Sequence, residues 1–207
     1  MAFLSEGDLE DAFLATLAEL GHARMYGVQH LPEGSGRLRE SYREAILEPV
    51  LVDSLRRINP GLPDSALRAA ASKITDSVFA TDLVQENRRI HRLLVDGVKV
   101  TFLANGEEVN AVVRLVDWDD RANDWRAVSQ FDVVGMSPRI PDVVVFLNGM
   151  PLVVVELKGT EGKDIEAAFN QIETYKAQVP DLFRTTLLNV ISDGHNARYG
   201  SLSAGLD

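Results

Sequence analysis

The spacing of apolar residues is helical in the first half of this chain. Residues 5–20 place leucines and Phe13 three or four positions apart, which is the spacing of an amphipathic helix. Ser5 is the expected N-cap of this helix, and Gly21 is its expected stop. The predicted apolar stripe consists of Leu9, Phe13, Leu17 and Leu20.

A short strand and a loop are predicted next, over residues 22–39, and three more helices follow. These helices are expected at about 41–58, 64–78 and 83–95, because proline and glycine residues separate the three apolar patterns. We interpret residues 41–96 as a helical scaffold that packs on a sheet.

From Val98 the apolar period changes to two, which predicts strands. The expected strands are 98–103 and 111–116, joined through Asn105-Gly106, then 126–134, both halves of 140–158, and 185–192. A helix from Asp164 to about residue 178 should connect the second strand of 140–158 to the strand at 185–192. These two strands should be parallel, because crossover connections join parallel strands. Residues 98–192 therefore predict an α/β fold with a mixed central sheet flanked by helices. Residues 1–207 suit one domain with a helical elaboration in its N-terminal half.

The segment 140–158 predicts an apolar hairpin with charges at its open end. Asn148-Gly149 is a strong hairpin turn signal, Asp142 opens the first strand, and Glu156 and Lys158 close the second. A strict two-residue turn would place Val155 opposite Asp142. An odd-length loop or a compensating bulge would instead place Glu156 there, and we expect this second arrangement.

Two carboxylates and one lysine leave an excess negative charge at the end of this hairpin. A salt bridge at the end of a sheet explains most Glu-x-Lys sequences, but here a second acid faces the pair. A divalent cation held by oxygen ligands would resolve the excess, and Mg²⁺ commonly takes only one or two protein carboxylates. That ligand set suits hydrolysis of a phosphodiester, with the lysine near the attacking water.

The same residues resemble a known nuclease motif. Pro141-Asp142, thirteen further residues and Glu156-Leu157-Lys158 resemble the PD-(D/E)xK motif, and Gln171 with Tyr175 resembles its Q-x-x-x-Y element. Together with the blocks at 190–194 and 197–201, this order resembles the N-terminal nuclease domain of the restriction (motor) subunit of type I restriction-modification enzymes. The resemblance covers nearly the whole chain and is sharpest over residues 83–201.

The resemblance implies Mg²⁺-dependent endonucleolytic cleavage of double-stranded DNA, with Mn²⁺ as a plausible substitute. Asp142, Glu156 and the carbonyl of Leu157 would hold the metal, and Lys158 would assist attack by water. Gln171 and Tyr175 would support the site and the DNA strand. Glu10 is a further candidate ligand, although a solvated first helical turn is the preferred interpretation of this residue.

The resemblance also implies that this chain is a fragment. The complete subunit would continue into an ATP-driven translocase, so ATP would act only in that absent part. Its partners would be double-stranded DNA and the modification (methyltransferase) and specificity subunits.

Composition and net charge bear on where this protein acts and how it reaches DNA. The chain has no cysteine, no signal-peptide pattern and no apolar run of the roughly 20 residues that cross a bilayer, which agrees with a cytoplasmic protein without a membrane partner. Its net charge of −10 argues against tight DNA binding by this domain alone and favours delivery to DNA by other domains. The alternatives are a stand-alone nuclease of the same superfamily that acts in DNA repair, and a non-catalytic docking module that keeps the nuclease fold.

Overall fold

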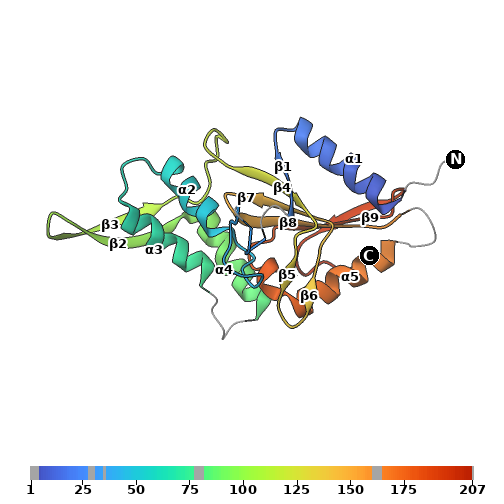
Figure 1. The fold of residues 1–207 in the computed structure, drawn as a ribbon. Coiled ribbons are helices and arrows are strands. Elements are labelled where there is room, and N and C mark those ends of the chain that lie inside the picture. Colours follow the sequence, from blue (N-terminus) through green and yellow to red (C-terminus); the bar gives the residue numbers. More distant parts are fainter. Residues whose placement is uncertain (1–4, 28–30, 35, 77–81, 160–164, 207) are drawn as a thin grey trace.

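The computed structural model describes residues 5–27, 31–34, 36–76, 82–159 and 165–206. Its centre is a six-stranded sheet in the order β1-β4-β7-β8-β9-β10 (Figure 1). The six strands are β1 (Ala23–Tyr26), β4 (Trp125–Ser129), β7 (Val143–Leu147), β8 (Met150–Leu157), β9 (Leu188–Ser192) and β10 (Ala197–Gly200). β1 is parallel to β4 and β8 is parallel to β9, whereas the other neighbours are antiparallel. The predicted mixed α/β fold, including the parallel crossover, is confirmed.

Two helices cover opposite faces of this sheet (Figure 1). Alternate residues of a strand point to opposite faces, and β8 is apolar on both. Val155 and Leu157 pack beneath α1 (Glu6–Glu19), whereas Val154 packs beneath α5 (Ile165–Gln178). The central hairpin is therefore buried from both sides, as its unbroken runs of valine require.

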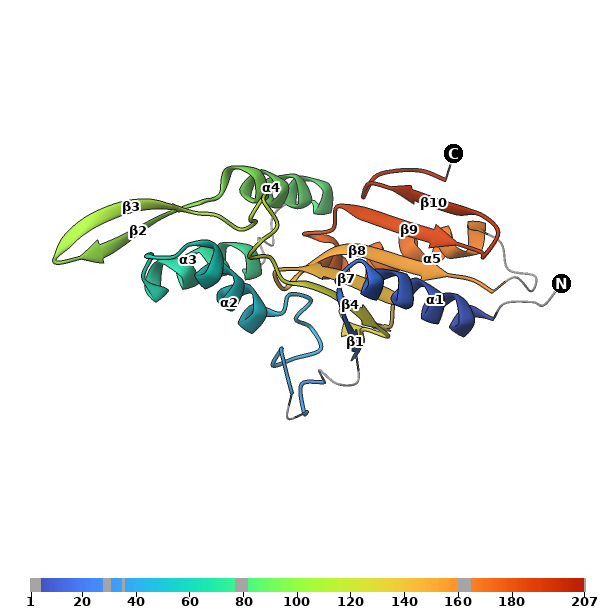
Figure 2. The same ribbon diagram turned by 90° about the horizontal axis from the view of Figure 1, so that it is seen from above.

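A helical lobe packs against the turn end of the central hairpin. It contains α2 (Glu48–Ile58), α3 (Asp64–Thr75) and α4 (Leu83–Asp96), and its core includes Leu147 and Met150 beside the turn. The strands β2 (Val98–Ala104) and β3 (Glu107–Val113) form a hairpin that extends away from the body (Figure 2). No helix within the described ranges is long and apolar enough to cross a membrane.

A second small hairpin, β5 (Val133–Val134) and β6 (Pro138–Arg139), lies beside α5, which is followed by the short 3-10 helix η2 (Pro180–Phe183). The single strand predicted over 126–134 is therefore wrong. The chain leaves β4 after Ser129 because Gln130 has a φ of 54°, a left-handed conformation that ends the ladder.

Several predicted boundaries also differ from the structure. The helix expected from residue 41 begins at Glu48, because Pro49 is accommodated only in the first turn of a helix. The helix expected to reach residue 78 ends at Thr75, and residues 77–81 lie outside the described part. The strand expected at 111–116 spans Glu107–Val113, because Asn105 and Gly106 alone form the turn. Asp164, the expected cap of α5, also lies outside the described residues.

Three other details were not anticipated. Leu14, on the sheet-facing side of α1, is fully buried, whereas Leu20 is 71% exposed because the helix ends at Glu19 and the chain turns away. β9 begins at Leu188, because the hydroxyls of Thr185 and Thr186 donate to the carbonyls of Pro151 and Leu182 and hold these residues outside the ladder. The edge strand β10 was missed, since its sequence is short and polar.

Candidate active site

The turn of the central hairpin determines which residues meet at its open end. Asn148 and Gly149 have φ of 52° and 81°, so the turn has two residues and pairs Leu147 with Met150. The register then shifts between Phe146, which pairs with Pro151, and Val145, which pairs with Val153. This leaves one extra residue on β8, a β-bulge, and the predicted compensating bulge is confirmed.

The bulge brings the two acids of the motif to one end of the sheet. Val143 pairs with Val155, so the next position in this register sets Asp142 against Glu156. Oδ2 of Asp142 accepts a hydrogen bond of 2.6 Å from the backbone N–H of Leu157. Nζ of Lys158 donates to Oε1 of Glu156 at 2.5 Å. The structure thus gathers all three predicted charged residues.

These side chains are buried, and their charges do not balance. Glu156 is 0% exposed, and its Oε2 has no hydrogen-bond partner among the described residues. Burial, and then the charge of Asp142, raise the pKa of Glu156 to about 7 although Lys158 lowers it. Burial also raises the pKa of Asp142, against the lowering effects of the Leu157 N–H and Lys158. The pair therefore favours an added positive charge, either a proton or a cation.

The donor set fits a hard divalent cation. Two adjacent carboxylates outnumber the one ammonium beside them, and Oε2 of Glu156 is buried without a geometric hydrogen-bond donor among the described residues. The Tyr175 hydroxyl nearby only partly offsets this, because it lowers the pKa of Glu156 less than burial and Asp142 raise it. Within the described ranges, no three His, Cys, Asp or Glu side chains are close enough to hold a metal by themselves. A two-carboxylate site suits Mg²⁺, which usually keeps waters or substrate oxygens as its other ligands.

Helix α5 presents Gln171 and Tyr175 next to the acids. Nε2 of Gln171 donates to the Tyr175 hydroxyl at 2.6 Å, and this hydroxyl donates to the carbonyl of Ile140 at 3.4 Å. Burial and the charge of Glu156 raise the pKa of Tyr175, so the hydroxyl keeps its proton. The two residues thus tie α5 to the segment that leads into Asp142.

Glu10 and Gln130 lie on the other side of Asp142. Oε2 of Glu10 accepts from Nε2 of Gln130 at 2.8 Å, while the backbone N–H of Gln130 donates to the carbonyl of Asp142 at 3.0 Å. The negative charge of Glu10 contributes to raising the pKa of Asp142. The metal-binding role of Glu10 stays a prediction. Gln130 was missed by sequence reasoning, because nothing in its neighbourhood signals contact with a residue twelve positions later.

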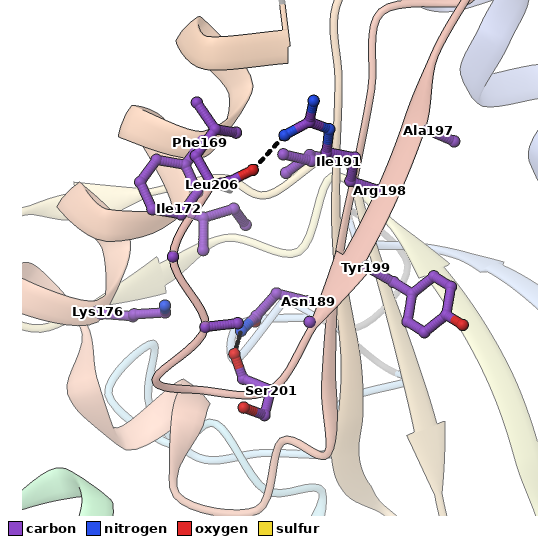
Figure 3. A pocket seen from close by; sticks show the side chains of 13 residues that line it. Phe169, Ile172, Lys176, Asn189, Ile191, Ala197, Arg198, Tyr199, Ser201 and Leu206 are labelled. Carbon is purple, nitrogen blue, oxygen red and sulfur yellow. Dashed lines mark hydrogen bonds between the residues drawn. The ribbon is translucent and has the colours of Figure 1, made fainter.

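A separate cavity of about 500 Å³ lies between α5, β9, β10 and the segment 201–206 (Figure 3). Its floor is apolar, with Ile172 and Ile191, and Asn189 donates to the carbonyl of Ser201 at its rim. None of the predicted site residues lines it. The acids, the lysine and the Gln-Tyr pair therefore form the candidate active site without this cavity.

The fold is restriction-endonuclease-like, of the PD-(D/E)xK kind. Its mixed sheet has a helix on each face, and Asp142 and the Glu156-x-Lys158 sequence lie at the ends of two adjacent antiparallel strands. Comparison with known proteins gives the family. The chain belongs to the family described as the type I restriction enzyme R protein N terminus, whose model matches residues 3–207.

Relatives of known name agree with this assignment. The chain is 40% identical to the type I restriction enzyme HindI endonuclease subunit of Haemophilus influenzae, over 97% of this chain and 19% of that protein. It is 30% identical to the SauMSSORF170P endonuclease subunit of Staphylococcus aureus, over 97% and 20% of the two chains. It is 27% identical to the EcoprrI endonuclease subunit of Escherichia coli, over 96% and 59%. The chain spans about a fifth of the length of the first two relatives.

Proposed function

We propose that this chain is the Mg²⁺-dependent nuclease domain of a type I restriction enzyme and that it cleaves double-stranded DNA. The observation that carries the proposal is the buried excess of negative charge where Asp142 and Glu156 meet beside a single lysine. The family and the names of the relatives support the same function. A structural ion pair would need only one acid for Lys158, and it would leave no carboxylate oxygen without a partner.

Asp142 and Glu156 would hold the metal, together with the carbonyl of Leu157. A bound Mg²⁺ supplies Lewis-acid stabilisation of the charge that develops on the phosphate, and Mn²⁺ would serve the same purpose. The Leu157 N–H fixes the orientation of the Asp142 carboxylate. This bond keeps one oxygen of Asp142 in place, so that the other can serve as a ligand.

Lys158 would act on the attacking water and on the charge of the transition state. Lys158 is 6% exposed and its ammonium already lies against Glu156, so a cation on Glu156 would free its N–H groups for the water and the phosphate oxygens. Gln171 and Tyr175 would hold the entry to Asp142 and contact the cleaved strand. Such preorganised donors typically contribute roughly 10²–10³-fold to a rate.

The rest of the enzyme would supply what this chain lacks. We propose that a translocase part of the same subunit uses ATP, and that modification and specificity subunits bring the complex to its DNA in the cytoplasm. The net charge of −10 supports delivery by other parts, because phosphate binding normally requires a basic surface.

Substitution of the lysine in the complete enzyme tests the proposal. Lys158→Ala and Asp142→Ala should each reduce DNA cutting at least about 100-fold, because each removes a group that acts in the transition state. ATP-driven translocation on the same DNA should persist. A gel assay of linear products and a translocation assay measure the two activities.

Lys176→Ala is the matched control, since Lys176 also pairs with a glutamate at 2.5 Å but lies outside the acid cluster. It should cut at the wild-type rate. Wild-type cutting by Lys158→Ala would contradict its assigned role. If neither Mg²⁺ nor Mn²⁺ binds at millimolar concentration and Asp142→Ala cuts normally, the chain is a docking module instead.

A further inference from the structure

A groove of about 650 Å³ runs beside the candidate active site. One wall is formed by residues 138–140, in and just after β6, and the other by α5. The α5 wall includes Asn170, Gln171, Thr174 and Tyr175, which recur at helical spacing along one face. The Tyr175 hydroxyl bonds to Ile140 across this space and lies close enough to Glu156 to affect its pKa, so this part of the groove adjoins the acids.

The groove differs in charge from the molecule as a whole. The chain has a net charge of −10, yet no acidic residue lines the groove within the described ranges. Arg139 is its charged group. Nη1 of Arg139 donates to the carbonyl of Pro138 at 3.3 Å, and within the described part of the chain its buried Nε has no hydrogen-bond partner. Among the described residues, Arg24 and Arg126 each have a carboxylate within 2.6 Å, whereas Arg139 forms no ion pair.

The position of Arg139 is fixed relative to both the helix and the acids. The β5–β6 hairpin is held on α5 by a 2.8 Å bond from the N–H of Met136 to the carbonyl of Gln178. Gly135 makes this approach possible, since a Cβ there would lie 2.2 Å from the same carbonyl oxygen. Arg139 precedes Asp142 by three residues, an extended distance of at most about 10 Å.

We propose that this groove binds the backbone of the cleaved DNA strand next to the scissile phosphate, with Arg139 and the exposed Asn170 amide as its phosphate-binding groups. The inference rests on the proposed function, and it adds residues outside the nuclease motif. An unpaired guanidinium suits a phosphate because it offers several donors in a planar fork. The exposed Asn170 amide adds a neutral donor on the facing wall. The groove has no acidic lining residue, so it would repel the DNA backbone less than the neighbouring Asp142 and Glu156 do, and it would provide a path for the strand beside them.

Cutting by the complete enzyme under single-turnover conditions tests Arg139. Arg139→Met should slow cutting roughly 10- to 100-fold, because one charge-assisted hydrogen bond is lost while the apolar stem is kept. Arg139→Lys should recover part of the rate. Arg88→Met, at an exposed arginine on α4, should cut normally. Thermal unfolding and translocation should be unchanged in all three, which separates phosphate binding from a structural role.

Disulfide trapping locates the strand without relying on cutting. The 207-residue chain has no cysteine, so Asn170→Cys introduces a single thiol into the groove. Duplex DNA with a tether on one backbone phosphate that ends in a pyridyl disulfide should react with this variant in the presence of Mg²⁺. The introduced thiolate displaces pyridinethione and forms a mixed disulfide with the tether. Ala177→Cys, an exposed position of α5 outside the groove, is the matched control and should react far less.

The possible results distinguish this inference from the proposed function. Normal cutting by Arg139→Met, or equal trapping by Asn170→Cys and Ala177→Cys, would overturn the groove while Asp142→Ala remains inactive. Normal cutting by Asp142→Ala would overturn the proposed function and the groove with it. Slow cutting by Arg139→Met together with selective trapping at position 170 would establish the path of the strand.

Discussion

Two buried glutamates of this protein have opposite electrostatic surroundings. Glu86, which is 4% exposed, accepts hydrogen bonds from Arg89 and Arg184, and the Arg89 bond is the main reason that its pKa is lowered. Glu156 shares one lysine with Asp142, and its pKa rises to about 7. Burial is the largest contribution to the raised pKa of Glu156, and the charge of Asp142 adds to it, whereas at Glu86 the hydrogen bonds and charges of two arginines outweigh burial. The acid pair is thus a local excess of charge, which destabilises the metal-free fold at neutral pH.

Glu156→Gln should therefore raise the free energy of unfolding of the metal-free protein at pH 8. The folded-state pKa of about 7 lies above the ordinary value of 4.5, so the folded state binds the proton more tightly. The stabilisation from this group is complete below about pH 4.5 and is lost as the pH rises through 7. A glutamine cannot ionise, so the gain should be on the order of 3 kcal/mol at pH 8 and near zero at pH 4.5. Urea unfolding in EDTA at several pH values measures this difference.

Glu86→Gln is the matched control and should have the opposite sign. Its carboxylate pairs with Arg89 and with the buried Arg184, so its loss removes the 2.9 Å partner of a buried guanidinium and should cost roughly 3–5 kcal/mol at pH 8. Equal destabilisation by both substitutions would show that Glu156 carries no excess charge.

At the scale of elements, the central hairpin depends on tertiary contacts at its turn. The side chain of Asn148 donates to the carbonyl of Leu115 and to Asn123, and accepts from the N–H of Asp124. Gly149 touches α2, since a Cβ there would lie 2.5 Å from the carbonyl oxygen of Leu47. The β2–β3 hairpin has the same Asn-Gly sequence with φ of 54° and 86°, but a Cβ on Gly106 would have no neighbour within 4 Å among the described residues.

Comparison of the two turns isolates the effect of this packing. Gly106→Ala should cost about 1–2 kcal/mol, because alanine is strained at positive φ. Gly149→Ala has the same strain and must also displace α2, so we expect a further cost of about 1–3 kcal/mol. Chemical denaturation of both variants measures the difference. Equal costs would show that α2 yields without resistance and that the turn is independent of the helical lobe.

The same elements explain which features the sequence predicts. Parity along the strands is local information, so the bulge and the meeting of Asp142 with Glu156 could be predicted. The end of β4 could not, because Gln130, whose positive φ ends the strand, packs against the distant Gly27, where a Cβ would lie 2.0 Å from the carbonyl oxygen of Gln130. The contact of Tyr175 with Ile140 likewise joins segments that are 35 positions apart. Residue types and strand parity thus predicted which charged side chains meet, whereas the contacts that hold them in place depend on how distant elements pack.

At the scale of the whole molecule, the net charge opposes DNA binding, whereas the candidate active site and its groove favour local contact with a DNA strand. The net charge of −10 repels a polyanion, while the acid-free groove and the acid pair suit one strand at short range. Long-range attraction sets the rate and strength of DNA binding, whereas the local groups set the chemistry. The domain should therefore depend on some other part for its concentration at DNA.

Tethering tests this dependence. Alone at about 150 mM salt, the chain should bind duplex DNA more weakly than about 10⁻⁴ M, below the usual range for non-specific binding, and should cut it negligibly. Fusion to a sequence-specific DNA-binding module raises the effective concentration to the millimolar range. We expect Mg²⁺-dependent cutting near the site of that module, which sequencing of the product ends would map. The fused Asp142→Ala variant should bind equally and cut nothing. Efficient cutting of naked DNA by the untethered chain at this salt concentration would instead support a stand-alone nuclease, since charge repulsion would then not limit its access.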